Sequence, residues 1–65
     1  MKIGDKVNVY QDPFTVSNLE DSGVIKSTPK PTGDNDVKGR PMFRCAIEFD
    51  GEDTLYPRTI SEPAR

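Results

Sequence analysis

Side chains suited to covalent catalysis are scarce in this chain of 65 residues, which has one cysteine, Cys45, and no histidine. Without histidine there is no Ser-His or Cys-His pair for nucleophilic catalysis, and the usual zinc ligands are missing. Cys45 lies in register with Phe43 and Ile47, so we interpret it as a small buried hydrophobe. We therefore predict a protein that is not an enzyme and needs no cofactor.

Acidic side chains gather around one short segment and recur in the middle of the chain. They are Glu48, Asp50, Glu52 and Asp53, with Asp34 and Asp36 further upstream. Such carboxylates can bind a hard cation such as Ca²⁺. Their spacing does not match an EF-hand loop, however, and turns favour Asp for backbone reasons alone. We interpret them as solvated turn residues and predict no metal site.

Basic side chains concentrate in the middle of the chain and leave two binding functions open. For a protein partner, we predict a surface formed by the Pro-rich loop 30–41 with Arg44 and Tyr56, in which Lys30, Lys38 and Arg40 are the basic loop residues. For nucleic acid, the alternative, phosphate contacts would come from Lys26, Lys38, Arg40 and Arg44. Because Phe43 and Phe49 are expected inside, few aromatic rings remain to stack on bases. We therefore favour the protein partner.

The segment Met42–Phe49 is the element most clearly suited to position these side chains. Its residues alternate strictly between two predicted faces. Side chains point to opposite faces of a strand with period two, which predicts a half-buried antiparallel strand. Its predicted inner residues are Phe43, Cys45, Ile47 and Phe49, and its predicted outer residues are Met42, Arg44, Ala46 and Glu48.

The other predicted strands are short. Lys6–Tyr10 alternates, Gly23–Thr28 is rich in β-branched residues, and Asp50-Gly51 predicts a tight hairpin into Thr54–Tyr56 with Leu55 inward. Pro57 is expected to end that strand, and 58–60 to add a short helical turn or a last strand with Ile60 inward.

Two long loops are expected between the strands. The first covers 11–22, with Phe14 and Leu19 as apolar anchors, and the second covers 27–41 as an exposed, Pro- and Gly-rich segment.

Length and composition indicate one small folded domain. We place it at 1–61, followed by a flexible C-terminal tail at 62–65. No apolar run suits a signal peptide or a membrane span, so we expect a cytoplasmic protein without membrane contact, either a monomer or a weak homo-oligomer. The net charge of −2 gives no global attraction to nucleic acid.

The order of these features resembles a known class of fold. G-D-K-V near the start, a long loop, an alternating strand, a D-G hairpin and Y-P-R-T-I at the end are similar to SH3-like barrels, above all to small barrel proteins of bacteria and phages. The resemblance implies an all-β fold, a small SH3-like barrel of four to five short antiparallel strands with two long loops. It also implies a small bacterial or phage accessory protein that attaches to a partner.

Two narrower resemblances carry their own expectations. Tyr10, Phe14, Tyr56 and Pro57 resemble the groove by which SH3 domains hold proline-rich peptides, but the chain has no tryptophan. T-L-Y-P-R-T-I is similar to a segment of type II dihydrofolate reductases, which are tetrameric SH3-like barrels. That resemblance would place Thr54, Leu55 and Tyr56 in a central pore, although Thr54 replaces the glutamine that this family uses.

Overall fold

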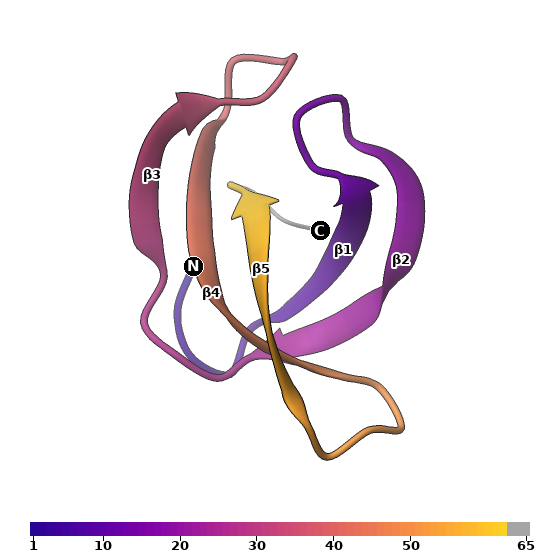
Figure 1. The fold of residues 1–65 in the computed structure, drawn as a ribbon. Coiled ribbons are helices and arrows are strands. Elements are labelled where there is room, and N and C mark those ends of the chain that lie inside the picture. Colours follow the sequence, from indigo (N-terminus) through magenta and orange to yellow (C-terminus); the bar gives the residue numbers. More distant parts are fainter. Residues whose placement is uncertain (63–65) are drawn as a thin grey trace.

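Five antiparallel strands form one sheet in the computed structural model, which describes residues 1–62 (Figure 1). They are β1 (Lys6–Asp12), β2 (Ser17–Ile25), β3 (Lys30–Asn35), β4 (Pro41–Phe49) and β5 (Leu55–Ser61). The predicted all-β class with four to five antiparallel strands is confirmed. Residues 1–62 contain no helix long and apolar enough to cross a membrane.

Strand β4 is central because it pairs with three other strands. Along one edge it pairs with β5, from Met42 opposite Ser61 to Glu48 opposite Leu55. Its other edge is shared, since β2 pairs with its C-terminal end and β3 with its N-terminal half. The segment with the clearest alternation in the sequence is thus the one that holds the sheet together.

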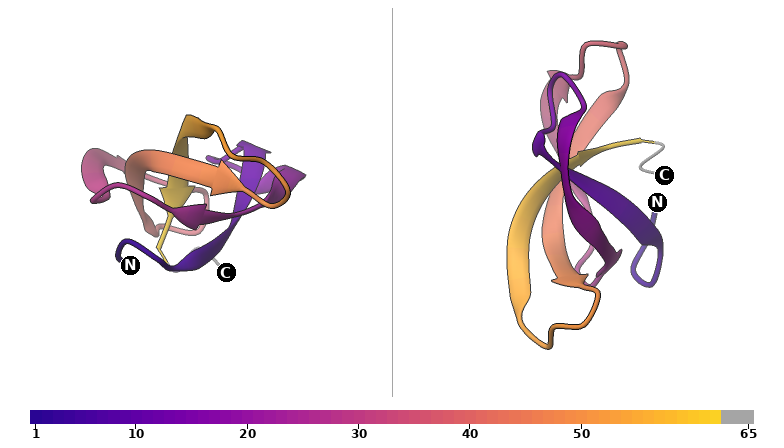
Figure 2. Two further views of the ribbon diagram at one scale, coloured as in Figure 1. Left: turned by 90° about the horizontal axis from the view of Figure 1, so that it is seen from below. Right: turned by 90° about the vertical axis from the view of Figure 1, so that its right-hand side faces the viewer.

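The sheet curls into a barrel-like shape without closing (Figure 2). Strand β1 pairs with β2 but only packs near β5, with no ladder between them. The core lies inside the curl, where seven buried side chains form one cluster: Val7, Val9, Ile25, Cys45, Ile47, Phe49 and Ile60. The inward positions predicted for Cys45, Ile47, Phe49 and Ile60 are confirmed.

The ends of β4 depart from the predicted alternation. Phe43, predicted inside, is only half-buried, and Met42, predicted outside, is 1% exposed. Met42 is not part of the main cluster. Met42 pairs with Ser61, whose side chain helps to lower the pKa of the buried Asp36 in the turn between β3 and β4. The turn between β3 and β4 therefore covers a position that the two-residue period alone places in solvent.

The first predicted loop is mostly strand. β1 continues to Asp12 and β2 begins at Ser17, so only residues 13–16 connect them. The expected anchors were wrong, because Phe14 is 50% exposed and Leu19 is 57% exposed. The outer half of this hairpin extends beyond the core, and its turn contacts the β3–β4 turn through the Val37 amide, which donates to the Phe14 carbonyl at 2.7 Å.

The second predicted loop contains β3, so the prediction of an irregular segment over 27–41 was wrong for Lys30–Asn35. The predicted exposure was right, since all six residues of β3 are exposed. Pro31 and Gly33 misled the prediction. An edge strand tolerates both, and the β3–β4 register shifts between Pro31 and Asn35, around Gly33 at φ 87°.

The last hairpin forms where predicted, but with a longer connection over 50–54, in which Gly51 has φ 80°. Leu55, expected inside, is 52% exposed because it pairs with outward-facing Glu48. Pro57 does not end the strand, since β5 runs through it to Ser61. β5 pairs with another strand along one edge only. Pro57 has no amide hydrogen to donate, and an edge strand accommodates such a residue.

Glu62, the first residue of the predicted flexible tail 62–65, is held by two contacts. The Glu62 amide donates to the Pro41 carbonyl at 3.0 Å, and its carboxylate lies 3.9 Å from the N-terminal amine. The remainder of the predicted tail, 63–65, lies outside the described residues.

Candidate binding groove

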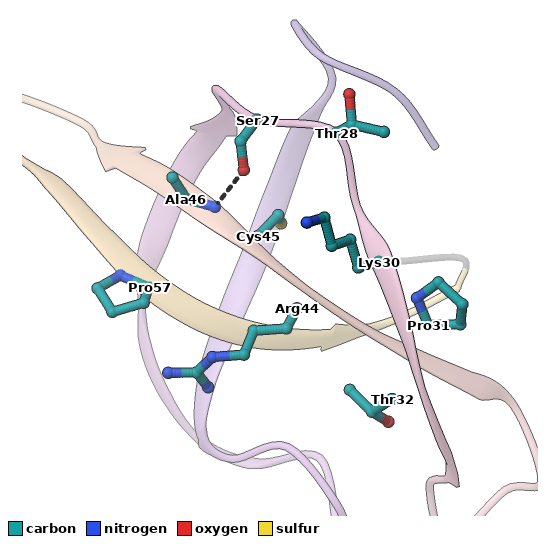
Figure 3. Close-up of a pocket in the computed structure, with 9 residues that line it drawn as sticks. All are labelled: Ser27, Thr28, Lys30, Pro31, Thr32, Arg44, Cys45, Ala46 and Pro57. Carbon is teal, nitrogen blue, oxygen red and sulfur yellow. Dashed lines mark hydrogen bonds between the residues drawn. The ribbon is translucent and has the colours of Figure 1, made fainter.

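A shallow groove of about 560 Å³ crosses the outer face of the sheet, over β3, β4 and β5 (Figure 3). Its lining combines two cations, three hydroxyls and an apolar floor. The residues are Ser27, Thr28, Lys30, Pro31, Thr32, Arg44, Cys45, Ala46 and Pro57.

The strand registers bring these side chains together. Lys30 is the ladder partner of Arg44, and Pro57 is the partner of Ala46. Residues directly opposite in an antiparallel pair share a face, so both pairs project into the groove. The Ala46 amide donates to the Ser27 hydroxyl at 2.8 Å, which fixes the β2–β3 connection as the wall of the groove.

The two cations of the groove have no acidic partner among residues 1–62. Within residues 1–62, five Lys and Arg side chains form ion pairs: Lys2, Lys6, Lys26, Arg40 and Arg58. The three others in this range are Lys30, Lys38 and Arg44, and Arg44 donates only to the Thr59 hydroxyl at 3.3 Å. Like charges directly opposite on neighbouring strands repel each other. Anions bound to Lys30 and Arg44 would reduce that repulsion.

The structure divides the predicted protein-binding residues. Lys30 and Arg44 share the groove, whereas Lys38 lies in the turn between β3 and β4. Arg40 is committed to Asp36 at 2.9 Å, and Tyr56 lies next to Pro57 on β5, facing the core side of the strand. Lys26, which was predicted only for the nucleic-acid alternative, forms an ion pair with Glu48, with its Nζ 3.7 Å from the carboxylate.

Arg40 has a structural role, because it is paired with the buried carboxylate of Asp36. This carboxylate accepts hydrogen bonds from the amides of Lys38 and Arg40 and from Arg40 Nε, at 2.9 to 3.0 Å. Burial opposes ionisation, but these donors and the Ser61 side chain outweigh it and lower the pKa of Asp36 from 3.8 to about 2. The ion pair therefore holds the β3–β4 turn in place.

Tyr56 belongs to a cluster of side chains from β2, β4 and β5. Its ring centroid is 5.6 Å from that of Phe49, and the Arg58 guanidinium lies 5.4 Å from both ring centroids. Arg58 also makes two hydrogen bonds of 2.9 Å to Glu20 on β2, and this hydrogen bonding lowers the pKa of Glu20. This cluster connects β5 to β2 where no backbone ladder does.

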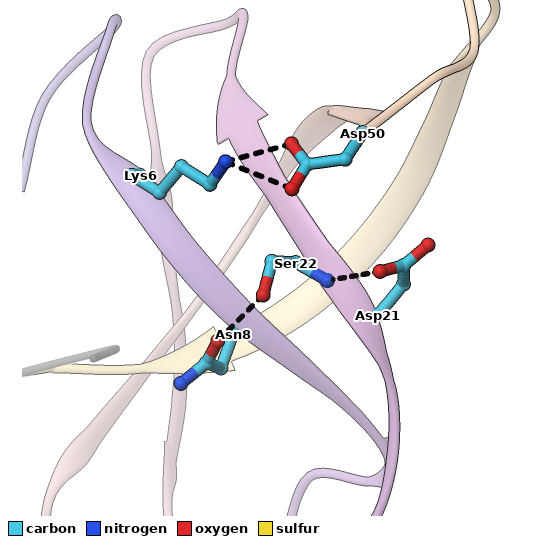
Figure 4. Close-up of polar contacts among 5 residues, drawn as sticks. All are labelled: Lys6, Asn8, Asp21, Ser22 and Asp50. Atoms are coloured by element: carbon cyan, nitrogen blue, oxygen red, sulfur yellow. Dashed lines mark hydrogen bonds and ion pairs between the residues drawn. The ribbon is translucent and has the colours of Figure 1, made fainter.

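The acidic residues are dispersed rather than gathered. Lys6 Nζ lies 2.8 Å from both carboxylate oxygens of Asp50 (Figure 4), and Glu52 accepts a hydrogen bond from the Tyr56 hydroxyl. On the neighbouring β1–β2 surface, the Ser22 hydroxyl donates to Asn8 at 2.8 Å. In the part of the chain that the structure describes, no three Asp, Glu, Cys or His side chains are placed to hold a metal ion.

Cys45 forms part of the groove floor but is 5% exposed, which confirms its interpretation as a buried residue. Burial raises the pKa of its thiol. The thiol therefore stays protonated near neutral pH, the form that is neither a good nucleophile nor a metal ligand.

Sequence reasoning did not assign Ser27, Thr28 or Ala46 to the binding surface, and it named Pro57 only in the resemblance to an SH3 peptide groove. The available signal was the alternation of Pro57 with Tyr56 on β5. That signal becomes useful only once the hairpin register places Pro57 opposite Ala46, and the longer connection over 50–54 sets that register.

Comparison of the chain with models of protein families, with curated proteins and with solved structures gave no match. The resemblance to SH3-like barrels therefore stays a prediction. So does the resemblance to type II dihydrofolate reductases, although Leu55 and Tyr56 occupy successive positions on β5 and cannot both face one pore.

Proposed function

We propose that this protein is a non-catalytic, cytoplasmic binding module that holds an extended segment of a partner protein in the groove of Lys30 and Arg44. The observation that carries the proposal is the pair of opposed cations, Lys30 and Arg44, which have no acidic partner in the described part of the chain and lie beside a floor of Pro31, Ala46 and Pro57. A surface that combines unneutralised charge with apolar contact area suits a polypeptide.

A nucleic-acid ligand has less support from the same groove. No aromatic side chain lines it, so bases would find no ring on which to stack. Of the four cations expected to contact phosphates, Arg40 and Lys26 already pair with acidic residues. Because each neutralised phosphate contributes separately to affinity, the loss of two contacts removes much of the electrostatic term.

The proposal is tested by affinity capture with the tagged full chain from an extract of the cells that make it, with and without nuclease. The groove variant is Lys30→Ser with Arg44→Ser. The matched control is Lys2→Ser with Lys38→Ser, which removes the same charge elsewhere.

We expect one or more proteins to be retained by the wild type and the control in both arms, and to be lost with the groove variant. Capture that disappears with nuclease would make nucleic acid the ligand. Capture that the groove variant retains would overturn the assignment of the groove.

A further inference from the structure

We infer that the groove selects a polypeptide segment with two acidic side chains at alternate positions, one paired with Lys30 and the other with Arg44. This inference rests on the proposed function and names the chemistry of the bound segment.

The two cations are arranged for two anions rather than one. Figure 3 shows Lys30 extending from β3 over the groove, while Arg44 extends along the face of β4 toward β5. The Arg44 guanidinium is held on that side by Thr59, the ladder partner of Arg44. A single phosphate group prefers several donors that converge on it. Side chains that diverge from neighbouring strands instead fit two separate carboxylates.

An extended polypeptide presents carboxylates in that way. Side chains two residues apart on a strand point to the same side, about 7 Å apart, and the residue between them points away. Acidic residues with one residue between them therefore both face the groove. Adjacent acidic residues cannot, because one of the two would point to solvent.

The edge of the sheet is poorly suited to binding by strand addition, so side chains must supply the specificity. β3 is the edge strand beside the groove, and it carries Pro31, which has no amide hydrogen, and the register shift around Gly33. Both features protect an edge from pairing with another strand. Recognition by charge is therefore expected to weaken as salt increases.

The occupant is a partner protein rather than a second copy of this chain. Three stretches of this chain carry acidic residues at alternate positions: 34–36, 48–50 and 50–52. Each already has an acidic residue paired within the fold, because Asp36 pairs with Arg40, Glu48 with Lys26 and Asp50 with Lys6.

The test measures the binding of fluorescein-labelled peptides to the full chain by fluorescence anisotropy at low salt. The probe peptide is Ser-Thr-Glu-Thr-Glu-Thr-Ser. Its controls are the isomer Ser-Thr-Glu-Glu-Thr-Thr-Ser, the version with Gln for Glu, and a version with one phosphoserine in place of both acids.

We expect the alternating peptide to bind about tenfold more tightly than the isomer or the Gln version. Both cations are at the surface, so Lys30→Gln or Arg44→Gln should each weaken binding roughly two- to fivefold and the double variant about tenfold. Lys38→Gln, which removes an equal charge outside the groove, should leave binding unchanged.

Equal binding of the two Glu isomers would overturn the inference, as would tighter binding of the phosphoserine peptide. If no peptide binds while protein capture still depends on the groove, the acidic segment is wrong but the proposed function stands. If capture has also lost that dependence, both fail. Self-association abolished by the groove double variant would make a second copy the occupant and would overturn the inference as well.

Discussion

Gly23→Ala should destabilise this fold through a direct collision. Gly23 lies on β2 opposite Phe49 of β4, and its backbone is in an ordinary conformation. A Cβ at this position would lie 2.6 Å from Ile47 Cγ2 and 2.7 Å from the Glu48 carbonyl oxygen. Both distances are shorter than real Cβ atoms adopt, so either β2 or β4 must move.

The magnitude follows from how firmly these neighbours are held. Ile47 is fully buried and packs in the core, and Glu48 lies between ladders to β2 and β5. Neither atom is the far end of a flexible side chain. Overpacking usually costs about 1–3 kcal/mol, and the backbone contact favours the upper half of that range. For a domain of this size, about 2–3 kcal/mol corresponds to a fall in Tm of roughly 8–24 °C.

The assay is chemical and thermal unfolding of four proteins: the wild type, Gly23→Ala, Ile47→Val and the double variant. Residues in contact usually couple, and removing the Ile47 Cδ1 methyl group gives this side chain room to shift, so the cost of Gly23→Ala should be at least about 0.5 kcal/mol smaller in the Ile47→Val background. Gly33→Ala is the contrasting control. It has open space around the added Cβ but a φ of 87°, and its cost should be backbone strain that is independent of Ile47.

A free energy of unfolding for Gly23→Ala within about 0.5 kcal/mol of the wild type would refute the reasoning, since a surface substitution without a collision has that size of effect. It would mean that β2 and β4 are not in the register that places Gly23 against Ile47.

Three further perturbations test other parts of the fold. Ile47→Ala should lower the free energy of unfolding by about 2–5 kcal/mol, whereas Arg44→Ala should change it by less than about 0.5 kcal/mol in the same denaturant titration; equal effects would contradict the assigned strand faces. Because the pKa of Asp36 is lower in the folded state, its contribution is present above about pH 4 and is lost as the pH falls toward about 2. Asp36→Asn should flatten this part of a Tm-against-pH profile, and an unchanged slope would contradict the argument. Arg58→Met should cost about 1–2 kcal/mol by removing the contact with Glu20 and the guanidinium stacking, and an unchanged urea unfolding curve would show that this cluster does not stabilise the fold.

Glu20, the acidic residue that binds Arg58, makes the stability of the fold depend on pH in the same direction as Asp36 does. The hydrogen bonds from Arg58 lower the pKa of Glu20 below the ordinary 4.5, so they stabilise the fold above that pH and are lost as the pH falls through the lowered value. The difference in Tm between the wild type and Arg58→Met should therefore shrink in acid. A constant difference would indicate that stacking alone accounts for the effect.

The candidate site could be predicted only in part from the sequence. The surplus of positive charge in the middle of the chain was visible, and it included Lys30 and Arg44, which the structure places opposite each other. Which cations remain without acidic partners was not visible. The partners of Lys26 and Arg40 depend on strand register and on the fold of a turn, because Glu48 and Asp36 approach them only in the folded chain.

The sequence by itself determined the β class and the inner face of the central strand, because the two-residue period of Cys45, Ile47 and Phe49 is a local property of the backbone. Tertiary structure decided the rest. It made Pro31 part of an edge strand, left Leu55 exposed and buried Met42 beneath a turn. Each of these outcomes depends on what lies opposite the residue, in a neighbouring strand or a covering turn, and local pattern carries no information about that neighbour.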